Sequence, residues 1–386
     1  MISKLGTVRI IMDSQAGSCG KGKVVDWFAS QYNRPFIAIN NFMSNAGHTT
    51  VVDGETTMVQ HLPTSILNPN AILVIGPGAA ITPSILADEI IKYKDILGDR
   101  KVHIHPRAAV ILDHHRDYEK KKLKSGSTFK GCGAALAEKA MRQAILFLDM
   151  MEELHIYRKD PEHGLYGLSI EQGRALLENI IIQDYMDHIN ASLDIGTDVI
   201  IEGSQGTDLD INYGLNYPHT TSRQCHAGQL LADCGISPTY PNIEVYMVMR
   251  PYPIRISSST NLGDERYSGD YDGSNEISWD QVKAECGAPD EVEFGEQTTV
   301  TKKTRRVFEM NWNRLDYVAK LNRPTGIFIN FAQYIDWKML GRVEEITGKT
   351  AQFMKTVTNI TGCPVIGLGT GAERQDMIVT DEKAMI

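Results

Sequence analysis

The sequence predicts an α/β protein with a large, mostly parallel sheet covered by helices. Short apolar runs of strand length alternate along the chain with amphipathic stretches of helix length, and this alternation is typical of parallel strands joined by helical crossovers. Several runs are apolar throughout, as expected for strands that are buried on both faces. With 386 residues, 42 % of them hydrophobic, the chain can bury a large core without disulfides or structural metals.

Six runs have the length and composition of buried strands. They are residues 7–12, 35–40, 197–203, 242–249, 325–330 and 364–369. A helical pattern from Lys21 to Gln31 separates the first two runs. A second helix is predicted to begin after Thr82 and to run towards Leu97, because threonine is a good N-cap and Pro83 fits the first helical turn.

The predicted sheet also indicates where chemistry should be sought. Ligands of open parallel sheets bind outside the carboxyl ends of the strands. The loops that leave those ends follow Met12, Asn40, Glu202, Asn330 and Gly369. One further segment, 257–275, is polar and rich in glycine, which predicts a long surface loop.

Composition and charge exclude several classes of protein. The sequence has no run of about 18 apolar residues, so no membrane-spanning helix is predicted, and its N-terminal segment lacks the apolar run of a signal peptide. The six cysteines are scattered without a C-x-x-C pair, which favours reduced thiols in a cytoplasmic protein. The net charge of −9 argues against nucleic acid as a partner. The basic run 120–124 is interpreted as a solvated face.

The loop after the first strand carries a phosphate-binding pattern. Residues 17–23 read Gly-Ser-Cys-Gly-Lys-Gly-Lys directly before a helix, where backbone N–H groups and a lysine can hold phosphate. This is not a Walker A loop, because Gln15 stands where that motif needs glycine and Gly22 where it needs serine or threonine. A glycine-rich turn without a ligand is the alternative. Asp13, at the strand end, is read as a structural cap or as a proton acceptor.

Other loops carry side chains suited to nucleotide chemistry. His48 lies in the exit loop of the second strand, where an imidazole can donate a proton or stabilise charge, although histidines are often structural. Gln205 follows the third strand, and its amide suits the edge of a base. Hydroxyls and cations alternate over 298–306, a pattern that suits a small dicarboxylate. The glycine repeat over 367–371 marks close backbone approach to a ligand.

Taken in order, these segments resemble the adenylosuccinate synthetase family over residues 7–379. The matching motifs are G-x-x-G-K-G-K from Gly17, N-A-G-H-T from Asn45, H-L-x-x-S-I-L from His61, I-G-x-G from Ile75, E-G-x-Q-G-T-x-L-D-I from Glu202 and T-V-T-x-x-x-R-R from Thr299. The resemblance implies a single domain over residues 1–386 with the family's P-loop-NTPase-like fold, a Mg²⁺ cofactor and a homodimer. Family members transfer the γ-phosphoryl group of GTP to the 6-oxygen of IMP, and the amine of aspartate then displaces that phosphate.

The resemblance also implies roles for individual residues. The catalytic residues are expected to be Ser18, Lys21, His48 and Gln205. The nucleoside triphosphate is expected to contact Gly17, Gly20, Lys21, Gly22, Lys23, Gly47, His48, Thr49, Gln333, Gly369 and Gly371. The nucleoside monophosphate is expected to contact Ser18, Asn45, Ser127, Thr128, Gln205, Thr221, Lys303 and, from the neighbouring subunit, Arg142. Aspartate is expected to contact Thr299, Val300, Thr301, Lys303 and Arg305, and Mg²⁺ to contact Ser18 and Gly47.

A departure from the family pattern at Ser18 changes the expected substrate. The family has there an aspartate that acts as base on the purine N1–H and ligates Mg²⁺, and the neighbouring family glutamate is Cys19 in this chain. A serine hydroxyl is not a general base near neutral pH. Its smaller size leaves room for a 2-amino group, which guanine has and hypoxanthine lacks. Water, a phosphate oxygen and Asp13 remain as candidate proton acceptors.

A second departure concerns the phosphoryl donor. The family reads the guanine of GTP with a lysine-x-aspartate element after a strand, whereas this chain has Phe331, Ala332 and Gln333. No carboxylate remains to accept from guanine, but a glutamine can pair with adenine, so ATP or dATP is expected. Lys303 replaces a family arginine, which is expected to relax selection at the ribose 2′ position.

These changes resemble the phage branch of the family, whose members join aspartate to dGMP with ATP. The expected product is N6-succino-2-amino-2′-deoxyadenylate, a precursor of 2-aminoadenine in viral DNA. The expected location is the cytoplasm, of the host cell if the protein is viral. An ordinary adenylosuccinate synthetase that uses IMP and GTP is the first alternative, and an inactive nucleotide-binding relative is the second. A kinase is excluded because no Walker A loop is present.

Overall fold

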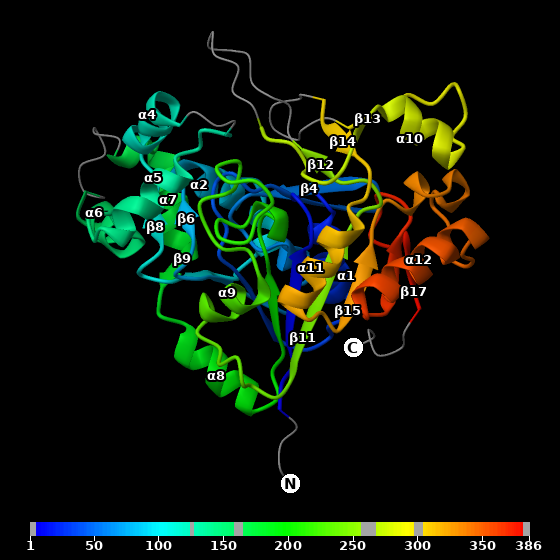
Figure 1. The fold of residues 1–386 in the computed structure, drawn as a ribbon. Helices are drawn as coiled ribbons and strands as arrows, with labels where there is room; N and C mark the ends of the chain where they lie inside the picture. Colours follow the sequence, from blue (N-terminus) through cyan, green and yellow to red (C-terminus); the bar gives the residue numbers. More distant parts are fainter. Residues whose placement is uncertain (1–4, 124–126, 158–164, 256–267, 297–303, 381–386) are drawn as a thin grey trace.

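The computed structural model describes residues 5–123, 127–157, 165–255, 268–296 and 304–380. These residues form one large sheet and three small ones, with helices packed against both faces of the large sheet (Figure 1). Within these ranges, no helix has both the length and the apolar character that crossing a membrane requires.

The large sheet has ten strands in the described chain, and all but one run parallel. The exception is the edge strand β17, which pairs antiparallel with β16. Across the sheet the order is β17 (Met377–Val379), β16 (Val365–Gly369), β15 (Gly326–Ile329), β11 (Ile243–Met249), β1 (Val8–Asp13), β10 (Val199–Glu202), β2 (Phe36–Asn40), β5 (Ala71–Ile75), β7 (Val102–Ile104) and β9 (Ile180–Ile182).

Strand β1 illustrates why this sheet is buried on both faces. All six of its residues are buried. Ile10 and Met12 pack in a cluster with α8 (Met186–Asp194) and α9 (Ala227–Ala232). Ile11 points to the opposite face and packs in a cluster with α1 (Lys21–Ser30). The alternation follows from the two-residue period of a strand, and helices on both sides then make both faces apolar.

The other helices complete the two outer layers. A third apolar cluster joins α11 to β15 through Leu315, Val318 and Ile327. The remaining helices are α2 (Pro83–Lys92), α3 (Lys94–Leu97), α4 (Asp113–Lys122), α5 (Cys132–Ala140), α6 (Phe147–Tyr157), α7 (Ile170–Asn179), α10 (Trp279–Cys286), α11 (Trp312–Asn322) and α12 (Gly348–Thr361).

Small sheets extend the carboxyl end of the large one. A hairpin of β3 (His48–Val52) and β4 (Glu55–Val59) starts at a residue that the sequence analysis singled out. A second small sheet has the order β12, β14, β13, and a third pairs β6 with β8. Their bounds are Ile254–Arg255 for β12, Arg306–Phe308 for β14, Glu276–Ile277 for β13, Ala80–Ile81 for β6 and Ala109–Val110 for β8.

The predicted fold class is confirmed, and so are the six predicted strands, which are β1, β2, β10, β11, β15 and β16. The sequence analysis did not predict β5, β7 and β9, which complete one side of the sheet. The last two have only three residues each, too few to carry a recognisable period. Their place is fixed by pairing with neighbouring strands, which is a tertiary effect.

The first predicted helix is confirmed as α1. The second, from Thr82 towards Leu97, has the predicted ends, but a break at Tyr93 divides it into α2 and α3. The chain leaves the helix at Tyr93 and resumes it as α3. The Tyr93 hydroxyl bonds both backbone groups of Met58, at 2.8 and 2.9 Å. Thr82 does occupy the N-cap position, yet its side chain makes no capping bond. Its hydroxyl instead bonds Ser44 Oγ at 2.6 Å.

The segment 257–275 is only partly a surface loop. Residues 256–267 lie outside the described chain, so the prediction is untested there. In the described remainder, Ser268 and Tyr271 are both 2 % exposed, which contradicts the prediction. Tyr271 is held inside because its hydroxyl donates to the buried carboxylate of Asp208.

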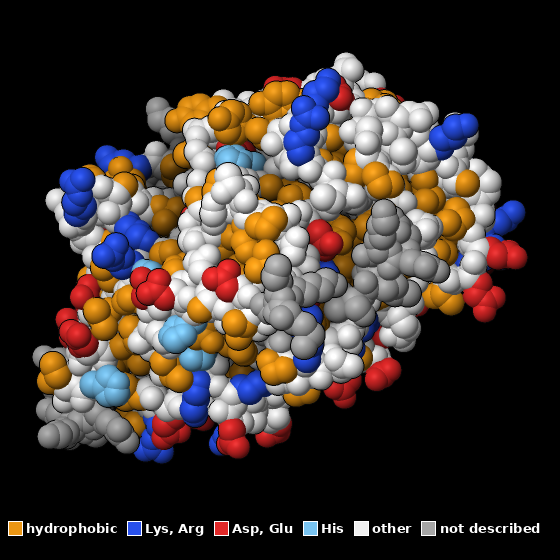
Figure 2. Space-filling model, turned by 90° about the horizontal axis from the view of Figure 1, so that it is seen from below, with side chains coloured by type: hydrophobic (Ala, Val, Ile, Leu, Met, Phe, Trp, Pro, Cys, Tyr) orange, Lys and Arg blue, Asp and Glu red, His pale blue; other side chains and the backbone are white. Residues whose placement is uncertain are grey.

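The composition predicts no single basic surface. On the face in Figure 2, basic and acidic side chains lie among apolar ones without gathering into one basic patch. In the run 120–124, Lys120, Lys121 and Lys122 are exposed at the end of α4, and the last residue lies outside the described chain. The six cysteines are buried and free, as expected for reduced thiols.

Candidate active site

The loop between β1 and α1 is the centre of the site, and its backbone conformation explains its glycines. Gly17 and Gly20 have φ values of 87° and 81°, and Gly20 is the N-cap of α1. Ser18 shares the left-handed region with a φ of 57°, which is unusual for a residue with a Cβ. Backbone N–H groups turned inward by such a loop make an anion-binding concavity at a helix start.

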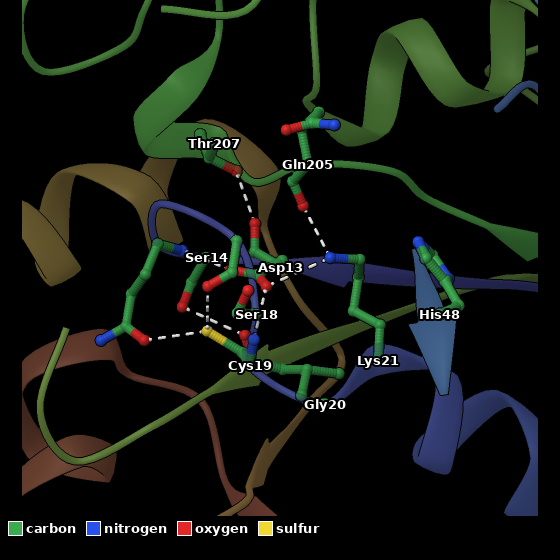
Figure 3. Close-up of polar contacts among 12 residues, drawn as sticks. Asp13, Ser14, Ser18, Cys19, Gly20, Lys21, His48, Gln205 and Thr207 are labelled. Carbon is green, nitrogen blue, oxygen red and sulfur yellow. Dashed lines mark hydrogen bonds and ion pairs between the residues drawn. The ribbon is translucent and has the colours of Figure 1, made fainter. Parts of the chain in front are cut away.

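The Asp13 carboxylate, at the end of β1, accepts hydrogen bonds from this loop (Figure 3). One carboxylate oxygen accepts the N–H of Gln15 at 2.8 Å, and the other accepts the N–H of Cys19 at 3.1 Å. The Lys21 ammonium lies 3.1 Å from the second oxygen. The side chain is buried, so these three donors are what satisfies its charge. The arrangement supports the structural-cap interpretation of Asp13.

Lys21 joins the glycine loop to the loop after β10. Its ammonium donates to the backbone carbonyl of Gln205 at 2.6 Å as well as to Asp13 (Figure 3). Only 6 % of the residue is exposed. Gln205 has a φ of 58°, and its side-chain amide donates to Asn45 Oδ1 at 3.2 Å. Lys21 therefore joins two loops that are distant in the sequence, and Gln205 connects them to a third, as the strand-end argument predicts.

His48 stands on the other side of Lys21 at the start of β3 (Figure 3). Its Nδ1 lies 2.5 Å from a carboxylate oxygen of Glu202, the last residue of β10. Glu202 is fixed in turn by the backbone N–H of Thr64 at 2.9 Å. A carboxylate on Nδ1 orients the imidazole and leaves Nε2 to face a substrate. Both side chains are at most 5 % exposed.

Glu202 is a functional residue that the sequence analysis missed. It opens the motif that contains Gln205, but no role was predicted for it. The available signal was its position, because a carboxylate that ends a buried strand and precedes a glycine faces the ligand edge of a parallel sheet. Its partner His48 is distant in the sequence, so the pairing itself could not be read from the chain.

Two of the residues predicted for the monophosphate, Asn45 and Thr221, lie near the start of α5. The Cys132 thiol contacts the backbone amides of Ser44 and Asn45, and Gly133 lies against Ser222. Thr221 is 9 % exposed, and its buried hydroxyl has no hydrogen-bond partner among the described groups. An unpaired buried hydroxyl destabilises the fold. A ligand that hydrogen-bonds to this hydroxyl would offset that cost.

Ser127, Thr128 and Arg142 lie at the outer side of this region. Ser127 is half-buried and accepts the N–H of Phe129 at 3.2 Å, whereas Thr128 is exposed. Arg142 is exposed beyond the end of α5, with a φ of 64°. This outward position is compatible with the prediction that Arg142 serves a neighbouring subunit, which stays a prediction.

The region predicted for the donor base contains polar atoms without protein partners. The side-chain oxygens of Asn330, Gln333 and Thr370 are buried and unpaired among the described groups. The Asn330 amide donates to the carbonyls of Cys19 and Gly20, at 2.7 and 3.0 Å. The glycine loop and the end of β15 are therefore in direct contact. The unpaired oxygens are acceptors placed for a ligand with N–H groups.

Lys23 and Gly371 form a tether that the sequence analysis did not predict. The Lys23 ammonium donates to the backbone carbonyls of Gly371 and Asp376, at 2.8 and 2.6 Å. Burial lowers the pKa of Lys23 to about 8, although Asp376 and Glu373 raise it in part. In this structure the cation connects the loop after β16, which contains Gly371, to α1. The predicted phosphate contact of Lys23 stays a prediction.

A side chain at Gly22 would be tightly packed, and replacement of this glycine is the first prediction. A Cβ at Gly22 would lie 3.0 Å from the carbonyl oxygen of Thr49 and 3.3 Å from His48 Cβ. We expect Gly22→Ala to lower the free energy of unfolding by about 1–3 kcal/mol, because overpacking forces the backbone apart. Urea unfolding measures the effect. Gly348→Ala is the control, since nothing lies within 4 Å there, and an unchanged stability of Gly22→Ala would contradict the packing argument.

Of the five residues predicted to bind aspartate, the structure describes only Arg305. Thr299, Val300, Thr301 and Lys303 lie outside the described chain. Arg305 is described, and its guanidinium donates to Ser18 Oγ at 2.7 Å. The residue expected to bind aspartate therefore contacts the residue expected to face the purine. Gly47 and Thr49 are exposed beside His48, where a triphosphate could reach them.

The protein groups predicted to ligate Mg²⁺ do not form a metal site by themselves. Ser18 Oγ accepts from the Arg305 guanidinium, and a metal ion on the same oxygen would face that cation. The Asp13 carboxylate is occupied by two amides and Lys21. Mg²⁺ prefers carboxylate, phosphate and water oxygens. The arrangement thus disagrees with the prediction that Ser18 ligates Mg²⁺.

Comparisons with known proteins agree with this geometry. The family model described as adenylosuccinate synthetase matches residues 10–337. An adenylosuccinate synthetase from Methanococcus vannielii is 32 % identical over 96 % of this chain and 98 % of that protein. An N6-succino-2-amino-2′-deoxyadenylate synthase from Salmonella phage PMBT28 is 31 % identical over 85 % of each chain.

A solved structure of a cyanophage S-2L enzyme has a similar fold. That protein is a succinoaminodeoxyadenylate synthetase bound to dGMP and to dATP as energy donor. Its TM-score is 0.77, its identity 28 %, and the match covers 99 % of this chain and 97 % of that one. With the site geometry and the family match in agreement, this chain belongs to the adenylosuccinate synthetase family, a family of carbon–nitrogen ligases.

Proposed function

We propose that this protein joins L-aspartate to C6 of dGMP at the expense of ATP or dATP. The observation that carries the proposal is Ser18 at the centre of the site, in a loop whose carboxylate, Asp13, is turned inward as a cap. A short hydroxyl side chain leaves room beside the purine for a 2-amino group. The phage relatives and the dGMP-bound cyanophage enzyme support this substrate.

The reaction has two steps. The γ-phosphoryl group of the donor passes to O6 of the purine while N1 loses its proton. The amine of aspartate then attacks C6, phosphate leaves with O6, and the product is N6-succino-2-amino-2′-deoxyadenylate. Both steps depend on alignment and on charge stabilisation, which the Lys21 ammonium and the His48 imidazole can supply. Ser18 is not a base, and Asp13 already accepts three donors, so we assign the N1 proton to water or a phosphate oxygen.

The donor base is proposed to be adenine because of Gln333. Its buried side-chain oxygen lacks a partner among the described groups and can accept the exocyclic N–H of adenine. A guanine would instead present two adjacent donors, for which the family uses a carboxylate. Mg²⁺ is proposed to arrive on the triphosphate, where it would screen the phosphate charge.

The proposal includes the assembly and the compartment. Arg142 is exposed beyond α5, and we propose that it completes the active site of a second subunit in a homodimer. Free buried cysteines fit a reducing compartment, so we propose a cytoplasmic enzyme, in a host cell if the protein is viral.

An ordinary adenylosuccinate synthetase remains the second candidate. It is favoured by the relative from Methanococcus vannielii, which is as similar to this chain as the phage enzymes are. An inactive nucleotide-binding protein is disfavoured by the ordered contacts of Lys21, His48 and Gln205.

A crossed activity assay tests the proposal. Phosphate release is measured with aspartate and Mg²⁺ while dGMP, GMP and IMP are each combined with ATP, dATP and GTP. We expect turnover with dGMP and ATP or dATP, and at least about tenfold less with IMP and GTP, the discrimination that one misplaced substituent gives. Turnover only with IMP and GTP would establish the second candidate. Binding of dGMP without turnover in any combination would establish an inactive protein.

A further inference from the structure

Arg250, directly after β11, is a fully buried cation with an unusual set of partners. It is 0 % exposed. One guanidinium nitrogen donates to Glu296 Oε2 at 3.1 Å, and another donates to Glu296 Oε1. The guanidinium carbon lies 4.3 Å from the ring centre of Phe331, in the segment predicted to bind the donor base. Burying a charge is costly unless it is paired. The burial of Arg250 therefore indicates a role for this cation inside the protein.

Glu296 is shared between Arg250 and Arg305. Its Oε2 lies 3.9 Å from Arg305 Nε, and its backbone carbonyl accepts the Arg305 N–H at 2.8 Å. The Tyr334 hydroxyl donates to Oε1 at 3.0 Å. Burial raises the pKa of the Glu296 carboxyl, but Arg250 and Arg305 outweigh burial and hold that pKa below its usual value. The carboxylate is therefore charged at neutral pH.

Both arginines reach Ser18. Arg250 donates to the Ser18 backbone carbonyl at 3.2 Å, and Arg305 donates to the Ser18 hydroxyl at 2.7 Å. One carboxylate thus fixes two cations on the residue that departs from the family pattern. Ser18 has a strained φ of 57°, which persists only where surrounding contacts hold it.

Glu296 also lies next to the segment that is predicted to bind aspartate. It directly precedes 297–303 and Arg305 closely follows that segment, which contains the residues predicted to bind aspartate. The bond between Arg305 N–H and the Glu296 carbonyl joins the two ends. The two described residues that flank this segment are therefore held together, on the same side as Ser18.

We propose that Glu296, with Arg250, is a positioning residue that sets Arg305 and Ser18 for aspartate. The pair does not touch substrate; it holds the cation that binds the aspartate carboxylate and the hydroxyl beside the purine in one geometry. The inference rests on the proposed function for the identity of the dicarboxylate. It adds a charge network that ties the aspartate site to the phosphoryl-donor loop.

The test compares three variants with the wild type. Glu296→Gln keeps the shape and removes the charge, and Glu291→Gln makes the same change at an exposed glutamate. We expect Glu296→Gln to raise KM for aspartate by about 10–100-fold, the usual effect of a lost charge-assisted hydrogen bond, and to leave KM for the donor within about threefold. Glu291→Gln should change neither constant.

A double variant separates positioning from mere stability. Arg250→Met/Glu296→Leu removes both buried charges, which often leaves stability unchanged or improved. We expect the double variant to have about the melting temperature of the wild type, but a KM for aspartate as high as that of Glu296→Gln. If the double variant has both the melting temperature and the KM for aspartate of the wild type, the pair is a structural element only and the inference is overturned. An unchanged KM for aspartate in Glu296→Gln would also overturn it.

A binding measurement keeps the inference separate from the proposed function. Thermal protection by aspartate is recorded in the presence of dGMP and a non-hydrolysable ATP analogue. Protection of the wild type with about tenfold weaker protection of Glu296→Gln, the shift expected for one lost charged contact, supports the inference even if turnover fails. Equal protection of both proteins overturns the inference alone. A wild type that aspartate neither protects nor converts overturns the proposed function and the inference together.

Discussion

Replacing His48 by alanine is expected to lower kcat by about a thousandfold, within the range for loss of a positioned acid–base group. Its Nδ1 is held by Glu202 at 2.5 Å, so Nε2 is left to meet the phosphoryl group that moves. Binding of dGMP should change by no more than about threefold, because an interaction made only in the transition state does not contribute to the ground state. Single-turnover phosphate release and dGMP titration measure the two quantities.

Two further variants sharpen this prediction. Glu202→Gln keeps the side-chain shape but removes the charge that orients the ring, and we expect a smaller loss of kcat, about 10–100-fold, as for other orienting groups. His114→Ala removes an exposed histidine outside the site and should leave kcat unchanged. Equal losses of kcat and dGMP affinity in His48→Ala would make His48 a binding residue and contradict the acid role.

Replacing Ser18 by aspartate is expected to shift preference from dGMP towards IMP by about 10–200-fold in the ratio of kcat/KM values, the range for adding or removing one group in a snug pocket. The longer side chain fills the space that we assign to the 2-amino group. Its carboxylate can also accept the N1 proton, which the hydroxyl cannot. Steady-state kinetics with both monophosphates, at saturating aspartate and ATP, measure the ratio.

Ser18→Asn separates size from charge in this second prediction. Asparagine has the size of aspartate but is no base, so it should disfavour dGMP without favouring IMP turnover. Both variants keep an oxygen that can accept from Arg305, whose guanidinium donates to Ser18 Oγ. A ratio that stays the same in Ser18→Asp would mean that the 2-amino group lies elsewhere, and the substrate argument from Ser18 would fall.

Local chemistry predicted the parts of the site that lie on single loops. Glycine is the residue that tolerates a positive φ, so the pattern around Gly17 and Gly20 indicated the turn that the structure shows. The buried strands were recognisable because runs such as TGIFIN are rich in apolar and β-branched residues over the length of a strand. Gln205 was expected in the loop after a buried strand and lies there, whereas His48 was expected in a loop and instead begins the unpredicted strand β3.

The pairs that define the geometry were beyond prediction from one sequence. His48 and Glu202 meet because β3 begins beside the end of β10, and their separation of 154 positions in the sequence gives no local signal. The same holds for Arg250 and Glu296, which lie in different loops and meet beside Phe331. Such contacts depend on the order of strands in the sheet, which long-range pairing decides.

The sequence by itself determined the fold class, the loops that carry chemistry and the departure at Ser18, because periodicity, glycine conformations and side-chain type are local properties. Only the tertiary structure decided that Asp13 is a cap, that Lys23 is a tether and that Arg305 lies on Ser18. A charged group in a protein interior takes whichever partners the fold brings near, since an unpaired buried charge is too costly to persist. The partners of these residues were therefore set by packing and not by their neighbours in the chain.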